Sequence, residues 1–497
     1  MEQILVNGTL LQVSSGELVS KILQEHVAFK MPCAGQGHCG KCKVYAKGQL
    51  SQPDGVELEK LTGEELEKGI RLACRTRVMG EAVISTEYHG TSKILLGEQI
   101  IFGEERLFQN FGVAIDVGTT TIAAQLYGDN GLLAQAGCDN PQGAFGADVI
   151  SRIERSLAGE GRQLAEAVRK GINELIGGLC VEGGCSPQQI DTMVITGNTA
   201  MLYLLTERNP ESLSHAPFQA DWLAGEWIRG EELALLCKQA RVWLPPCISA
   251  FVGADIVSAL MSVDILKKED KRLLVDIGTN GEIALWNQGR LLCCATAAGP
   301  VFEGAGISCG MQGEDGAISH VSYEPGKEGF TVEVIGAGAP RGICGCGVIY
   351  AVSCLLQSEI LDETGYLEDE VVVISGDITM NQEDIRKVQL AKSAICAGIE
   401  TLLKRSGQQM DALDEFLVAG GFGAFLNLEA AGGIGLLPKE KAKRTTVCGN
   451  AALAGAAKAL WDNSCEKEAA DIIAAATPLN LAEDPFFAER YMEGMFF

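Results

Sequence analysis

The stretch Asp276-Ile-Gly-Thr-Asn-Gly-Glu282 decides how this chain is expected to fold. It lies between two apolar runs, Leu273 to Val275 and Ile283 to Trp286, so it has the pattern of a β-hairpin bend. Its glycines and small hydroxyl side chain let backbone N–H groups approach a polyphosphate, and its aspartate can hold Mg²⁺ through water. A near copy, Asp116-Val-Gly-Thr-Thr-Thr121, follows the apolar run Val113 to Ile115. The two copies predict two phosphate loops.

The chain from Phe111 onward is duplicated around these two loops. Each half begins with a strand that ends at the loop, continues with two more strands, and then has an amphipathic helix. Each half ends with a strand that runs from an Asp to a Gly six residues later and with a helix of small residues. Such residues let two helices cross closely, as a hinge between halves requires. The matched segments, first half before second, are Leu164 to Leu179 with Leu390 to Leu403, Asp191 to Gly197 with Asp414 to Gly420, and Gly253 to Leu260 with Gly449 to Ala456.

Residues 1–88 are predicted to form a separate unit. A hairpin is indicated by Ile4–Val6 and Leu10–Val13 around an Asn-Gly turn, and a helix by residues 17–27. Four cysteines follow, three of them spaced C-x5-C-x2-C, and four thiolates suit an iron–sulfur cluster or zinc. The glycines between the cysteines favour the cluster, because they let N–H groups point at its sulfides. The cysteines are Cys33, Cys39, Cys42 and Cys74.

Composition limits the classes of function. The 497 residues are 47% hydrophobic and carry 40 basic against 65 acidic side chains, a net charge of −25. This charge argues against nucleic acid or an anionic membrane as a partner. The sequence shows no signal peptide and no apolar run long enough for a membrane span, so a cytoplasmic location is expected. Most of the 18 cysteines are then expected to be buried thiols in a reducing compartment.

The two regions resemble two known families. Residues 1–88 resemble a [2Fe-2S] ferredoxin of the β-grasp fold, which implies that the four cysteines above are the cluster ligands and that His38 is solvated. Residues 111 to about 460 resemble the actin, Hsp70 and sugar-kinase superfamily of ATPases, with its duplicated ribonuclease-H-like fold. That resemblance implies an adenosine loop at Gly420-Gly421-Phe422-Gly423.

The combination is similar to the reductive activators of corrinoid proteins. The similarity includes the motif Gly299 to Met311 and the ending Glu483 to Phe497. Two departures are Cys346, where a serine is expected at a helix start, and a connector, 89–110, too short for an extra middle domain. The expected domains are thus 1–88, the linker 89–110, ATPase halves 111–265 and 266–460, and a tail, 461–497, packing on the ATPase or a partner.

The resemblance also implies roles for individual residues. Asp116 and Asp276 would organise Mg²⁺ and the attacking water, with Glu282 and Asp255 as candidates for positioning that water. ATP would be held by the two phosphate loops and the adenosine loop. The residues expected to bind it are Gly118, Thr119, Thr120, Gly278, Thr279, Asn280, Gly420, Gly421 and Phe422.

The implied function is ATP-dependent transfer of one electron from the cluster to cob(II)alamin in a corrinoid protein of a methyltransferase system, giving Co(I). A low-potential electron donor and a homodimer partner are further expectations. Alternatives are a small-metabolite kinase with a redox-sensing ferredoxin, an activator of a radical dehydratase, and an assembly or chaperone module with a structural cluster. In dehydratase activators two cysteines per subunit share a cluster across a dimer; Cys344 matches one, but Lys387 stands near the place of the other.

Overall fold

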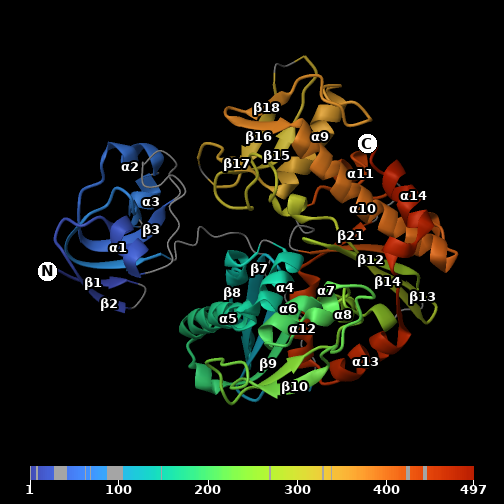
Figure 1. Ribbon diagram of the computed structural model, residues 1–497, viewed down its shortest axis with the longest axis horizontal. Helices are drawn as coiled ribbons and strands as arrows, with labels where there is room; N and C mark the ends of the chain where they lie inside the picture. Colours follow the sequence, from blue (N-terminus) through green and yellow to red (C-terminus); the bar gives the residue numbers. More distant parts are fainter. Residues whose placement is uncertain are drawn as a thin grey trace. The chain divides into compact units, whose positions relative to one another are not determined.

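A computed structural model describes the chain except residues 1, 7–8, 27–41, 62, 68, 87–104, 147, 268–269, 327–328, 337, 421–425 and 440–444. The chain divides into two compact units, residues 1–91 and 92–497 (Figure 1). Most of the predicted connector, 89–110, falls on residues outside the described part.

The N-terminal unit is a five-stranded mixed sheet with strand order β2-β1-β5-β3-β4. The predicted hairpin is confirmed, because β1 and β2 pair antiparallel with Val6 opposite Thr9. The predicted helix begins at Val19 rather than residue 17, and its apolar face, with Ile22 and Leu23, packs into the core. The elements are β1 Glu2–Val6, β2 Thr9–Val13, α1 Val19–His26, β3 Lys43–Leu50, α2 Gly55–Lys60, α3 Gly63–Glu67, β4 Ile70–Leu72 and β5 Val78–Ser85.

The second unit contains two six-stranded sheets whose orders confirm the duplication. They are β10-β11-β9-β6-β7-β8 and β21-β20-β12-β13-β14-β22. In each sheet three strands form an antiparallel meander, and the first of them pairs in parallel with a later strand. The paired elements are β6 Phe111–Val117 with β12 Arg272–Ile277, β7 Thr121–Gly128 with β13 Gly281–Asn287, β8 Gly131–Asp139 with β14 Arg290–Thr296, β9 Ile190–Gly197 with β20 Glu415–Ala419, and β11 Arg241–Leu244 with β21 Thr445–Gly449.

The matched helices are also present. α5 Gly161–Gly183 and α10 Gln382–Ser406 are the long amphipathic pair, and α8 Ala254–Ser262 and α12 Ala451–Trp461 are the small-residue pair. The predicted close crossing of α8 and α12 is confirmed at Gly455, where a Cβ atom would lie 1.8 Å from the carbonyl oxygen of Ser258. The two halves therefore meet with backbone against backbone.

Elements inserted into this frame complete the unit. A small sheet of β15, β16 and β17 precedes α9, and a two-stranded sheet of β18 and β19 precedes α10. The remaining α-helices and strands, with the short helix η5, are α4 Val149–Arg155, α6 Thr199–Leu205, α7 Glu211–Ser214, β10 Glu226–Arg229, η5 Pro300–Glu303, β15 Ala317–Ser322, β16 Thr331–Val334, β17 Gly342–Ile343, α9 Gly345–Gln357, β18 Val371–Ser375, β19 Ile378–Asn381, α11 Leu428–Gly433, α13 Cys465–Ala475, β22 Ala476–Pro478 and α14 Pro485–Glu493.

The C-terminal helix α14 lies beside α10, red against orange in Figure 1. Arg405 of α10 forms an ion pair with Asp484 at 2.7 Å, and Gln389 donates a hydrogen bond to the carbonyl oxygen of Met495 at 2.5 Å. The buried Lys392 donates to the carbonyl oxygen of Phe496 and lies 4.8 Å from the ring centre of Phe497. The tail thus covers the outer face of α10. Within the described residues, no helix combines the length and apolar character that crossing a bilayer requires.

Candidate functional site

A cavity of about 510 Å³ opens between the two predicted phosphate loops. Each loop closes on itself by a backbone hydrogen bond, from Gly118 N–H to Thr121 in one and from Gly278 N–H to Asn280 in the other, at 2.9 and 3.0 Å. Each cleft residue predicted from the sequence and described here lines this cavity. These residues are Asp116, Gly118, Thr119, Thr120, Asp255, Asp276, Gly278, Thr279, Asn280, Glu282 and Gly420. Gly421 and Phe422 of the predicted adenosine loop lie outside the described residues.

Six carboxyl groups line the cavity among the described residues, and crowding changes the acidity of those between the two loops. Burial raises the pKa of Asp116 to about 6, although Asn450 lowers it by a hydrogen bond. Burial and the charge of Asp116 raise the pKa of Asp255 to about 7, and burial with both of these neighbours raises that of Asp276 to about 8. The pKa of Glu282 is raised well above its ordinary value, first by burial and then by Asp255. A nearby cation favours the ionised form of carboxyl groups crowded in this manner.

Among the described residues that line the cavity, there is no Lys or Arg side chain to serve as that cation. Oxygen ligands of this kind suit Mg²⁺, which keeps several of its water molecules when it binds through carboxylates. Among the described residues, no group of three or more His, Cys, Asp or Glu side chains is arranged to hold a metal ion directly. The carboxylates that line the cavity supply oxygen ligands of the kind that a hydrated Mg²⁺ ion prefers.

Two asparagines that were not among the predicted site residues donate hydrogen bonds to side chains of the first phosphate loop. Asn198 caps α6 through its side-chain oxygen and donates its amide N–H to Thr119 Oγ1 at 3.1 Å. Asn450 caps α12 in the same manner and donates to Asp116 Oδ2 at 3.0 Å. Each follows a glycine that ends a strand, Gly197 or Gly449. The sequence signal for both was the Gly-Asn pair at the start of a helix.

Glu303 was also missed as a site residue. Its two carboxylate oxygens accept hydrogen bonds from Thr120 Oγ1 at 2.7 Å and Thr279 Oγ1 at 3.0 Å, so it connects the two loops. The two hydroxyl oxygens are themselves only 3.2 Å apart. Burial raises the pKa of Glu303, and the two threonines lower it. Its motif, Gly299 to Met311, was identified from the sequence, but a carboxylate inside a glycine-rich segment has no pattern of its own.

Gly420 shows why a glycine ends strand β20 beside the second loop. Its φ is +102°, which L residues with a side chain rarely adopt. A Cβ atom there would lie 2.3 Å from the carbonyl oxygen of Ile277 and 2.7 Å from Asp276 Oδ1. The backbone of the predicted adenosine loop therefore starts in direct contact with the second phosphate loop.

Cys344 and Cys346 line the same cavity at the beginning of α9. A hydrogen bond from the thiol of Cys346, followed by backbone N–H groups at the helix start, lowers the pKa of Cys344 to about 7, whereas the pKa of Cys346 is raised. Cys346, which stands where a serine was expected, thus places a thiol donor beside the acidic thiol of Cys344 in the cleft.

The second candidate site is in the N-terminal unit. Cys42 and Cys74 are buried, and their sulfur atoms are 3.3 Å apart without a disulfide. Their segments are paired by a hydrogen bond from Ala73 N–H to the carbonyl oxygen of Cys42. Two thiols this close can bind one metal ion, so this half of the predicted ligand set fits an iron–sulfur cluster. Cys33, Cys39 and His38 lie outside the described residues.

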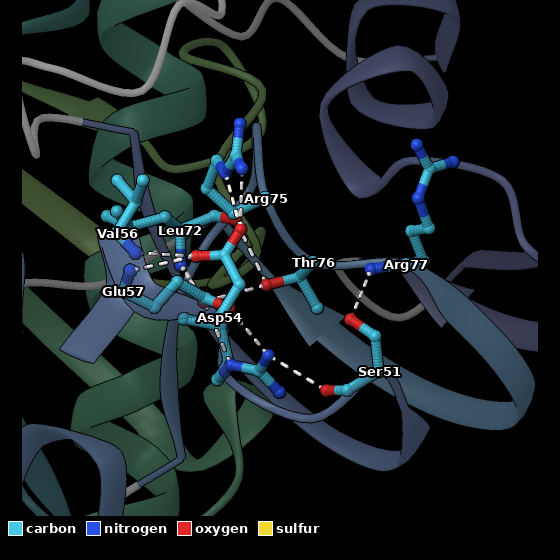
Figure 2. A network of polar contacts seen from close by, with 9 residues as sticks. Ser51, Asp54, Val56, Glu57, Leu72, Arg75, Thr76 and Arg77 are labelled. Carbon is cyan, nitrogen blue, oxygen red and sulfur yellow. Dashed lines mark hydrogen bonds and ion pairs between the residues drawn. The ribbon is translucent and has the colours of Figure 1, made fainter.

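The buried Glu57 contacts the chain on both sides of Cys74, and Figure 2 shows its contacts with Leu72 and Thr76. Glu57 accepts two hydrogen bonds from Arg71, at 3.0 and 2.8 Å, one from Leu72 N–H at 2.9 Å and one from Thr76 Oγ1 at 3.1 Å. Its neighbour Asp54 caps α2 and pairs with Arg75 at 2.7 Å. The position of the fourth cysteine therefore depends on these charged contacts as well as on the apolar core.

Three family descriptions match consecutive parts of the chain. Residues 4–79 match the 2Fe-2S iron-sulfur cluster binding domain, residues 111–268 match the RACo middle region, and residues 270–497 match the C-terminal domain of RACo, the ASKHA domain. The middle region corresponds to the segment that folds as the first sheet and its helices.

Whole-chain comparisons agree with these matches. The chain is 35% identical over 426 residues to the corrinoid activation enzyme RamQ of Eubacterium limosum, covering 78% of this chain and 70% of RamQ. It is 25% identical over 396 residues to the [Co(II) methylated amine-specific corrinoid protein] reductase of Methanosarcina barkeri, covering 71% and 70%. A solved structure of a reductive activator for corrinoid, iron-sulfur protein superposes with a TM-score of 0.73 at 27% identity, over 100% of this chain and 98% of the other.

Proposed function

Because the chain belongs to the family of corrinoid activation enzymes, we propose that it performs the ATP-dependent reductive activation of a corrinoid protein. The reaction is a one-electron transfer to cob(II)alamin that restores Co(I) for a methyltransferase or demethylase system. One observation carries the proposal: a single chain combines a cysteine pair fit for a cluster with a cleft between two phosphate loops. The [2Fe-2S] cluster, when bound, supplies the one-electron carrier.

The energetics explain why such a chain needs ATP. Plant-type clusters have reduction potentials near about −400 mV, and Co(I) is a stronger reductant. Each ~59 mV of uphill one-electron transfer costs about 1.4 kcal/mol. A nucleotide that closes the cleft can favour a complex in which the cobalt is easier to reduce, since binding can shift an equilibrium by its differential affinity for two shapes.

The cleft residues receive the following proposed roles. Asp116 and Asp276 hold hydrated Mg²⁺, which compensates the charge of both the carboxylates and the phosphates. The hydroxyl and N–H groups of the two loops donate to the β- and γ-phosphates. Glu282 and Asp255 position the attacking water, because both line the cavity near the two aspartates. Gly420, with Gly421 and Phe422, receives the adenosine.

The cluster ligands receive equally definite proposed roles. Cys42 and Cys74 bind one side of the cluster, as their 3.3 Å sulfur separation supports. Cys33 and Cys39 complete the set. A corrinoid protein is the electron acceptor, a separate low-potential protein is the donor, and a homodimer in the cytoplasm is the proposed state.

The deciding experiment mixes the reduced protein with a corrinoid protein in the cob(II)alamin state and follows Co(I) absorption, with and without Mg·ATP. Accumulation of Co(I) only with ATP is expected. Two variants separate the two sites: Cys74→Ser should lose the cluster spectrum and keep ATP binding, whereas Asp276→Asn should keep the spectrum and lose ATP turnover. Co(I) formation independent of ATP, or a phosphorylated metabolite in place of ADP and phosphate, would reject the proposal.

A further inference from the structure

Glu303 lies where the two phosphate loops come closest. Its carboxylate accepts one hydrogen bond from the loop of each half, from the hydroxyl groups of Thr120 and Thr279. Glu303 is 183 positions from Thr120 in the chain and 24 from Thr279. The hydroxyl oxygens are 3.2 Å apart, so the three side chains form one closed cluster. A single side chain thus ties the two halves together at the bottom of the cleft.

The same hydroxyl groups are the donors that a phosphate group between the loops requires. A threonine hydroxyl carries one hydrogen, so it cannot donate to Glu303 and to a phosphate oxygen at the same time. A carboxylate and a phosphate also repel each other, and no Lys or Arg among the described lining residues separates them. A phosphate that takes the hydroxyl donors of both threonines therefore excludes their contacts with Glu303.

The backbone that carries Glu303 is rigidly placed. Glu303 ends η5, and the next residue, Gly304, has φ +79° with Met311 O only 2.0 Å from where its Cβ atom would lie. On the other side, a Cβ atom on Gly345 would lie 1.7 Å from the carbonyl oxygen of Phe302. These close backbone contacts pack η5 against Met311 and the start of α9. We therefore expect the threonines to be released by movement of the loops or rotation of the Glu303 side chain.

We propose that Glu303 is a positioning residue that clasps the two phosphate loops in the nucleotide-free protein and is exchanged for the terminal phosphate of Mg·ATP. The exchange changes the spacing of the two halves, so the presence of the γ-phosphate is converted into a change of shape. ADP has no terminal phosphate to place between the threonines and leaves the clasp closed. This inference rests on the proposed function, in which the cleft binds Mg·ATP.

The first test compares nucleotide affinities of the purified full-length protein, with no corrinoid protein present. Dissociation constants for Mg·ADP and for a non-hydrolysable Mg·ATP analogue are measured by calorimetry. Glu303→Ala should bind the ATP analogue at least tenfold more tightly, because the two charge-assisted hydrogen bonds from Thr120 and Thr279 need no longer be broken, and should bind ADP as before. Glu303→Gln should shift in the same direction by less. Glu174→Gln, which removes a carboxylate paired with Lys170 on the distant helix α5, is the control for net charge.

The second test measures the clasp without any nucleotide. Hydrogen exchange of the backbone amides in residues 118–121 and 278–281 should be faster in nucleotide-free Glu303→Ala than in the wild type. The ATP analogue should remove this difference, since both proteins then have phosphate between the loops. Exchange in α5 should be equal in all variants, which shows that the fold is intact.

Three results overturn the proposal. Weaker binding of the ATP analogue by Glu303→Ala would mean that Glu303 holds the nucleotide or its metal. Equal shifts for ADP and the ATP analogue would indicate general damage to the cleft, and unchanged loop exchange would mean that no clasp exists. If the wild type binds no nucleotide, the proposed function fails, while the nucleotide-free exchange still decides whether Glu303 restrains the loops.

Discussion

Replacement of Glu57 by alanine should destabilise the N-terminal unit severely, because Glu57 is fully buried and holds a charged partner. Its side chain is 0% exposed and that of Arg71 is 8% exposed, so removal leaves a guanidinium without its counter-ion in the interior. Breaking a buried ion pair in this manner costs about 3–5 kcal/mol. The change also removes the acceptor of Leu72 N–H and Thr76 Oγ1 (Figure 2). Whole domains are stable by only about 5–15 kcal/mol, so much of the unit's stability is at stake.

The expected loss of stability can be converted into a decrease in melting temperature. One kcal/mol shifts the melting temperature of a domain of this size by roughly 4–8 °C, so a loss of about 3 kcal/mol predicts a decrease of roughly 12–24 °C. Cys74 lies between Leu72 and Thr76, and its ligation should fail in the same transition. The assay follows visible absorption and circular dichroism of the cluster during heating. ATP binding by the second unit, measured at a temperature below the transition, should not change.

Glu59→Ala is the matched control on the same helix, α2. Glu59 is 68% exposed and pairs with the neighbouring Lys60, so its loss should change stability by at most about 0.5 kcal/mol. Glu57→Gln retains the shape without the charge and should melt between the wild type and Glu57→Ala. If Glu57→Ala and Glu59→Ala lose the cluster within a few degrees of each other, the reasoning about the buried pair is wrong.

Three further predictions concern the second unit. Gly455→Ala should lower the melting temperature of this unit, because overpacking costs about 1–3 kcal/mol and exceeds the gain of about 1 kcal/mol in helix propensity. Gly178→Ala on the exposed face of α5, where nothing lies within 4 Å of the added Cβ atom, should raise it. A rise in melting temperature for both variants would contradict the close crossing. The rate of alkylation of Cys344, mapped by mass spectrometry, should increase with pH with a midpoint near pH 7, because the thiolate is the reactive form. Mg·ATP should slow the alkylation, and a midpoint near pH 9 would refute the prediction. Deletion of Phe496–Phe497 should destabilise the unit by about 1–3 kcal/mol, because buried Lys392 loses its acceptor, and adding Lys392→Met should restore most of the loss; no rescue would show that the lysine is not the cause.

The sequence was sufficient for the repeated part of the fold because the repeat is local. Each D-x-G-T loop stands between two apolar strands, and each half repeats the same order of strand and helix types. Such patterns depend on neighbours within about ten residues. The matched strands β11 and β21 were not predicted, because they are short and lie far from the phosphate loops in the chain. The small sheet before α9 has no partner in the first half and so had no repeat to reveal it.

The start of α10 shows a second limit of the sequence argument. The apolar pattern placed this helix from Leu390, but it begins at Gln382. Asn381 and Asp384 form a capping box there, each side chain accepting from the other's backbone N–H. The first two turns carry charged residues that a search for apolar spacing does not count. Here capping by polar side chains, rather than burial, fixes the boundary.

The residues missed in the cleft share a physical cause, and it bears on the proposed coupling between the nucleotide and the two halves. Asn450 reaches Asp116 across 334 positions, and Glu303 reaches Thr120 across 183, so no local pattern announces either contact. Both contacts end on the first phosphate loop, and both come from the second half. Helices α8 and α12 are in direct backbone contact at Gly455, so their crossing is closely packed. A phosphate that released Thr120 from Glu303 would leave the Asn450 contact and this crossing in place, and we expect the two halves to move about the crossing.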